Sequence, residues 1–66
     1  MTAYPVRQLA KEAEREVRFR RWVYSRAVGE GRMKLDDAER RIDMMEEIAR
    51  RLTREADDEE IAGRLL

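Results

Sequence analysis

Two long segments of the chain repeat apolar residues at helical spacing, and a short glycine-containing stretch separates them. In the first segment the apolar residues recur at steps of three, four or seven, which places them on one side of a helix with about 3.6 residues per turn. Pro5 suits the first turn, since its φ is already helical. We therefore predict a first helix over residues 5–28. Its core stripe is Val6, Ala10, Ala13, Val17, Tyr24 and Val28, with Leu9 and Ala27 on the flank.

The second segment has a regular stripe in which steps of three and four alternate. Asp36 and Glu39 have the spacing of a capping box, and Asp36 with Asp37 favours the positive end of a helix dipole. We therefore predict a second helix over residues 36–56. Its stripe is Leu35, Ala38, Ile42, Met45, Ala49, Leu52 and Ala56, and Met44 and Ile48 widen one edge.

The connection over residues 29–35 predicts a tight reversal of direction. Gly29 and Gly31 accept the left-handed conformation that ends a helix, and so short a connection returns the second helix antiparallel to the first. The acidic run at 57–60 is unfavourable at a helix C-terminus, and Gly63 also disfavours helix. We therefore expect one all-α domain over residues 1–66, a two-helix antiparallel hairpin with a loose acidic tail at 57–66.

Composition predicts self-association. The chain has 66 residues, and one this short hides only about 60% of its unfolded surface. It has no cysteine and no histidine, so disulfides and common metal sites cannot stabilise it. Residues 1–34 hold nine Lys/Arg against four Glu, and residues 35–66 hold six Arg against eleven Asp/Glu. Copies should attract each other, and we predict a homodimer that forms a four-helix bundle.

The residue inventory disfavours catalysis. Without cysteine or histidine the usual nucleophile and base pairs cannot be built, and Ser25 has no base near it in sequence. Paired carboxylates such as Glu46 and Glu47 have an arginine one turn on, which is typical of a solvated, ion-paired face. We predict a non-enzymatic protein without a catalytic residue, metal or cofactor. The chain lacks an apolar run of membrane-spanning length and a signal-peptide pattern, so we expect a cytoplasmic protein that binds no membrane.

One face of the first helix combines cations with aromatic rings and is the candidate contact surface. We call it the basic-aromatic face: Lys11, Arg15, Arg18, Phe19, Trp22 and Arg26. It fits a protein partner, because Trp, Phe and Arg are enriched at interfaces. It also fits nucleic acid, with arginines on phosphates and rings on bases. In a third interpretation Phe19 and Trp22 complete the core of the dimer, with the arginines arranged around them.

The stretch 21–48 resembles a set of small phage and prophage proteins that are mostly uncharacterised. Their pattern is a Val-Tyr-Pro-x-Trp-Val-like segment, then Gly-(Arg/Lys)-Met-(Ser/Thr), then Ala-x-Arg-x-Ile-x-x-Met-Glu-x-Ile. Ser25, Ala27 and Lys34 depart from it, at the positions of its Pro, its Trp and its Ser/Thr. The resemblance implies a helical hairpin of phage or prophage origin with an accessory role in the host cytoplasm, and it implies no activity. The matching residues are Val23, Tyr24, Val28, Gly31, Arg32, Met33, Ala38, Ile42, Met45, Glu46 and Ile48.

Together these observations predict a small interaction protein that binds a host or phage protein. Its expected contact residues are Arg15, Arg18, Phe19, Trp22 and Arg26. The alternative is a minor nucleic-acid-binding accessory protein that uses the same face. The acidic second half and the zero net charge weigh against that alternative, because they repel a polyanion unless the basic face is well separated from the acidic one.

Overall fold

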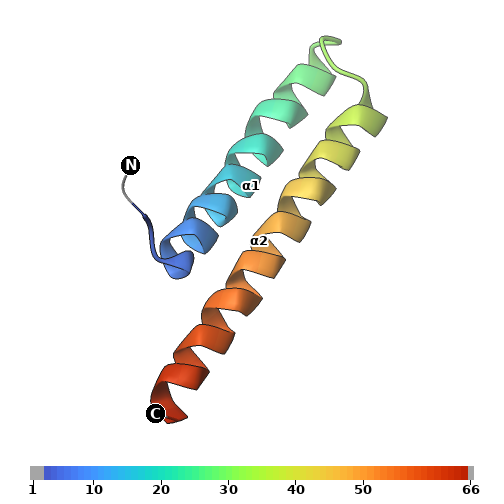
Figure 1. Cartoon of the computed structure of the whole chain (residues 1–66). Helices are drawn as coiled ribbons and strands as arrows, with labels where there is room; N and C mark the ends of the chain where they lie inside the picture. Colours follow the sequence, from blue (N-terminus) through green and yellow to red (C-terminus); the bar gives the residue numbers. More distant parts are fainter. Residues whose placement is uncertain (1–2, 66) are drawn as a thin grey trace.

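The computed structural model describes residues 3–65 and consists of two helices, α1 (Val6–Gly29) and α2 (Leu35–Leu65). They run antiparallel, side by side, with the turn at one end, and α2 extends past the start of α1 (Figure 1). The molecule measures 53 × 24 × 16 Å. The prediction of an all-α helical hairpin is confirmed.

The first turns of the two helices lie within one residue of the predicted positions. Pro5 is the N-cap of α1, and its carbonyl oxygen accepts hydrogen bonds from the backbone N–H groups of Gln8 and Leu9 at 3.0 and 3.2 Å. Helix α2 starts at Leu35, with Asp36 and Asp37 in its first turn. Asp36 therefore lies inside the helix rather than at the predicted cap, where its charge still favours the positive helix end.

Gly31 ends α1 through a Schellman motif. Its φ is +75°, the left-handed conformation that glycine adopts at no steric cost. The N–H of Arg32 donates to the carbonyl of Ala27 at 2.8 Å, and the N–H of Gly31 donates to that of Val28 at 3.1 Å. Gly29 is the last residue of α1 and has no positive φ. Of the two glycines predicted to end the helix, Gly31 is the one in the left-handed conformation.

The prediction that α2 ends near residue 56 is wrong. The helix continues to Leu65, through the acidic run and Gly63, and the expected loose tail is helical as far as it is described. Residue 66, also assigned to that tail, lies outside the described residues. A contact distant in sequence favours the longer helix: Arg7 of α1 binds the carboxylates of Asp57 and Glu60. These bonds offset the unfavourable position of the acidic run at the C-terminal end of the helix.

Small side chains form the seam between the helices. Among residues 3–65, six of the seven buried residues are alanines, and Val17 is the seventh. Ala13, Val17 and Ala49 form the central cluster, against which the partly buried Met45 and Leu52 pack. The remaining buried residues are Ala10, Ala27, Ala38 and Ala56. Both predicted stripes thus face the seam, except that Leu35 and the flanking Leu9 are exposed.

Candidate interaction surface

Phe19 and Trp22 lie on the outer side of α1, away from α2. On a helix with 100° per residue they point roughly opposite to Ala13 and Val17, which are buried in the seam. Their exposed fractions are 55% and 63%. In the single hairpin both rings are therefore surface groups, and neither is part of the seam.

Arg26 lies over the ring of Trp22. Its guanidinium carbon is 5.2 Å from the ring centroid, within the range of a cation–π interaction. The same guanidinium is 3.8 Å from a carboxylate oxygen of Glu30 at the end of α1. Such a contact at an exposed site contributes about 0.5–1 kcal/mol and restricts the orientation of the ring.

The other cations of the basic-aromatic face have few carboxylate partners. Arg15 is 3.5 Å from Glu12, and both side chains are more than 70% exposed. Within residues 3–65, Lys11 and Arg18 form no ion pair. All five predicted contact residues thus lie on one exposed surface of α1, as the helical spacing indicated, and their positive charge is only weakly compensated.

An ion-paired groove runs between the helices along one long side of the hairpin, and the sequence analysis did not identify it. Val17 and Ala49 form its apolar floor. Arg21 of α1 binds Glu46 of α2 at 3.0 Å, and the Thr53 hydroxyl donates to Glu14 at 3.3 Å. Its walls contain both cations and carboxylates, and the remaining wall residues are Arg18, Arg50, Arg54, Asp57 and Asp58. These pairs join residues far apart in sequence, so helical spacing alone could not reveal them.

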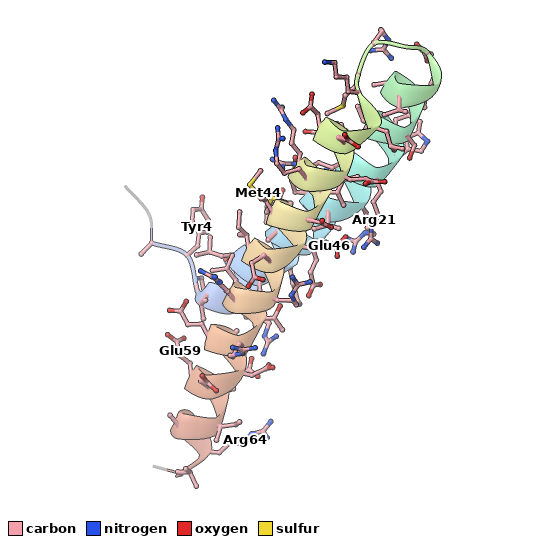
Figure 2. All side chains as sticks on the ribbon, turned by 90° about the vertical axis from the view of Figure 1, so that its right-hand side faces the viewer. Tyr4, Arg21, Met44, Glu46, Glu59 and Arg64 are labelled. Atoms are coloured by element: carbon pink, nitrogen blue, oxygen red, sulfur yellow. The ribbon has the colours of Figure 1, made fainter. Side chains whose placement is uncertain are left out.

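The opposite long side is more apolar. Figure 2 shows Tyr4 and Met44 projecting from one side of the hairpin and Arg21 and Glu46 from the other. We call the first the apolar side; its exposed members are Tyr4, Leu9, Met44 and Ile48. Beside them, Arg20 donates to Glu16 at 2.9 Å and to the backbone carbonyl of Arg41 at 3.1 Å. The widened stripe predicted from Met44 and Ile48 therefore corresponds to a surface that α1 leaves uncovered.

Arg7 closes the open end of the hairpin. Its hydrogen bonds to Glu60 and then to Asp57 raise its own pKa further above the ordinary range, so its charge is permanent. In return, the hydrogen bond from Arg7 lowers the pKa of Glu60 below its ordinary value. Two other arginines have the same effect on Glu47, whose pKa is lowered by hydrogen bonds from Arg50 and Arg51.

Residues 3–65 contain no group of three or more acidic side chains arranged to hold a metal ion. Neither α1 nor α2 is long and apolar enough to cross a membrane.

Comparison of the chain with protein-family models, with curated proteins and with solved structures gives no match.

Proposed function

We propose that the chain is a small non-enzymatic interaction protein that acts by occupying the surface of a partner protein. The observation that carries the proposal is the exposure of Phe19 and Trp22 on a regular helix, beside the cations of the basic-aromatic face. A ring held on a helix loses little conformational freedom on binding, and Trp with Arg is the combination most enriched among binding hot spots. The proposed contact residues are Arg15, Arg18, Phe19, Trp22 and Arg26.

The proposal includes self-association and a setting. We propose that two hairpins pair into a four-helix bundle, because a seam made mostly of alanine buries little apolar area for a chain of this length. The resemblance to phage and prophage proteins favours an accessory factor that acts on a host or phage protein in the host cytoplasm.

Nucleic acid is the second candidate, and one observation favours it. Most cations of the basic-aromatic face lie on the side of α1 away from the acidic helix α2, although Arg18 also borders the ion-paired groove. Lys11 and Arg18 form no ion pair within the described residues. This separation weakens the objection from zero net charge. Arginines on phosphates and Phe19 or Trp22 on bases would then provide binding without sequence preference.

A capture experiment with matched variants tests the proposal. The wild-type chain, the double variant Phe19→Ala/Trp22→Ala and the control Ile61→Ala/Leu65→Ala are immobilised and exposed to nuclease-treated lysate of the native host. The control also removes two large exposed apolar side chains, but from the far end of α2. We expect a protein that binds the wild type and the control and binds the double variant at least about 30-fold more weakly.

Two results would contradict the protein-partner proposal. One is capture of the same proteins by the double variant as by the wild type. The other is capture that occurs in untreated lysate and is absent from nuclease-treated lysate, together with binding of purified single-stranded DNA or RNA that weakens log-linearly with salt, because counterion release dominates such binding. The second result would favour the nucleic-acid candidate.

A further inference from the structure

We propose that a second copy of this chain docks on the apolar side, with α1 of each copy against α2 of the other and both turns at the same end. This inference rests on the proposed homodimer and specifies its surface and its arrangement. The basic-aromatic face then stays outside the bundle, so the dimer interface and the partner surface are separate.

The apolar side extends the seam without a break. Met44 and Ile48, which are 51% and 47% exposed, stand on the same flank of α2 as the partly buried Met45 and Leu52. Leu9 of α1 and Tyr4 continue this surface toward the open end. Covering it would add large aliphatic side chains to a core that otherwise contains mainly alanine, and the removal of their apolar area from water favours association.

The other two surfaces are poor interfaces between identical copies. A two-fold symmetric contact sets each patch against itself. Through the basic-aromatic face it would oppose Arg15, Arg18 and Arg26 to their own copies, which is repulsive. Through the ion-paired groove it would remove water from pairs such as Arg21 and Glu46, which are already bonded within one chain and gain little. The apolar side also carries one such pair, Arg20 with Glu16, but its exposed members are mainly large apolar side chains and it sets no row of like charges against itself.

The charges of the two helices select the arrangement. Helix α1 carries seven Lys/Arg against three Glu, and α2 carries six Arg against eleven Asp/Glu. Two hairpins can stack face to face with the turns at opposite ends, which sets α1 on α1 and α2 on α2, or with the turns at the same end, which sets α1 on α2. The first arrangement brings helices of like charge together. The second surrounds each basic helix with acidic neighbours, and it is therefore the favoured one.

The same charge pattern indicates that the molecule covering the apolar side is a second copy of this chain. A surface shared by one basic and one acidic helix is matched by a copy of itself turned about a two-fold axis along the helices. In the resulting bundle the two α1 helices lie on a diagonal, so their outer sides point in opposite directions. Each dimer would therefore present two basic-aromatic faces, one on either side.

The first experiment locates the interface by sedimentation equilibrium of the wild type, Ile48→Lys and Trp22→Lys. Ile48 and Trp22 are both large apolar residues on the surface of a single hairpin, so the two lysines are matched. We expect Ile48→Lys to raise the dimer dissociation constant at least about 30-fold and Trp22→Lys to leave it within about threefold of wild type. Circular dichroism checks that both variants remain helical, and Met44→Lys provides a second probe of the same surface.

The second experiment determines the arrangement with spin labels on Lys34→Cys, which introduces the only cysteine of the chain, in the turn. With both turns at the same end we expect electron–electron distances below about 20 Å, because neighbouring helices lie about 10 Å apart and the two labelled turns, on a diagonal of the bundle, about 14 Å apart. With turns at opposite ends the labels would be separated by at least the length of α1, about 36 Å.

Each outcome has a distinct meaning. A wild type that stays monomeric at micromolar concentration contradicts the dimer altogether. A dimer that Trp22→Lys dissociates and Ile48→Lys does not would contradict the apolar side as its interface, and would instead assign Trp22 to the dimer core. A dimer with widely separated labels contradicts only the arrangement. Partner binding through the basic-aromatic face is measured separately, in the capture experiment. A failure of that proposed function would therefore be distinguishable from each of these results.

Discussion

The seam between the helices and the outer side of α1 use apolar residues in opposite ways. The seam buries alanines and one valine, whereas the phenylalanine and the tryptophan of the chain stand on the outer side. Small side chains let two helices approach closely and set their alignment, but each buries little apolar area. The difference shows that the hairpin is aligned by its smallest residues and that its largest rings are not required for that alignment.

Enlarging a seam residue should produce the largest effect. Ala10 of α1 and Ala56 of α2 are each 1% exposed. Ala10→Leu inserts three further carbon atoms where there is no space for them, so we expect a loss of about 1–3 kcal/mol in the free energy of unfolding. Thermal or urea unfolding followed by circular dichroism measures it.

Ala62→Leu is the matched control, since Ala62 lies on the exposed surface of α2. The same substitution there should change stability by no more than about 0.5 kcal/mol. Equal losses from Ala10→Leu and Ala62→Leu would mean that the close approach of the two helices does not depend on small residues.

Removing Arg7 should have the next largest effect, confined to the open end. In Arg7→Ala we expect faster amide hydrogen exchange over residues 57–65 and a pKa of Glu60 that returns toward its ordinary value, because the hydrogen bond that lowers it is gone. Since that pKa is depressed in the folded state, the contribution of the pair is complete above the ordinary glutamate pKa, about 4.3, and is lost as the pH falls through the lower folded value. Carboxyl carbon NMR titration measures the shift.

The control for Arg7 is Arg64→Ala, which removes a cation from the same end of α2. It should leave the pKa of Glu60 closer to the wild-type value than Arg7→Ala does, since Arg7 donates a hydrogen bond to that carboxylate whereas Arg64 acts on it only through its charge. If the two variants gave the same titration curve for Glu60, the hydrogen bond from Arg7 would not be what lowers its pKa.

Truncating the outer ring should have the smallest effect on stability. Trp22 is 63% exposed, and the guanidinium of Arg26 lies over its ring. We expect Trp22→Ala to change the free energy of unfolding by less than about 1 kcal/mol, and the wild-type tryptophan to emit at the long wavelengths of a solvent-exposed indole. Blue-shifted emission together with a loss of about 3–5 kcal/mol on substitution would instead place the ring in the core of the assembly.

Local rules predicted most of the helical hairpin. Apolar spacing identified both stripes, and Gly31 marked the turn because few other residues tolerate its φ. The end of α2 was wrong for a specific reason. The helix dipole alone makes the acidic run unfavourable at a helix C-terminus. Arg7, about fifty residues earlier in the sequence, provides the compensating charge.

The candidate site, too, could be predicted from the sequence only in part. That Phe19, Trp22 and Arg26 share one face follows from helical spacing, and the exposure of that face follows from its position opposite the stripe. The ion-paired groove depends on which residues of the two helices come level, so it required the structure. The spacing of the residues contains no information about which surface a second molecule covers, because association depends on the whole charge pattern and the apolar area of both partners.

The pairs that join the two helices become more distant in sequence with each step away from the turn. Arg21 and Glu46 are separated by 25 residues, Glu14 and Thr53 by 39, and Arg7 and Glu60 by 53. Each contact shortens the loop that the next one must close, so the hairpin should form as a zipper that starts at Gly31 and reaches Arg7 last. Opening follows the same path in reverse. The ends of the helices at Arg7 and Glu60 separate first, while the part next to the turn stays closed until the whole hairpin unfolds.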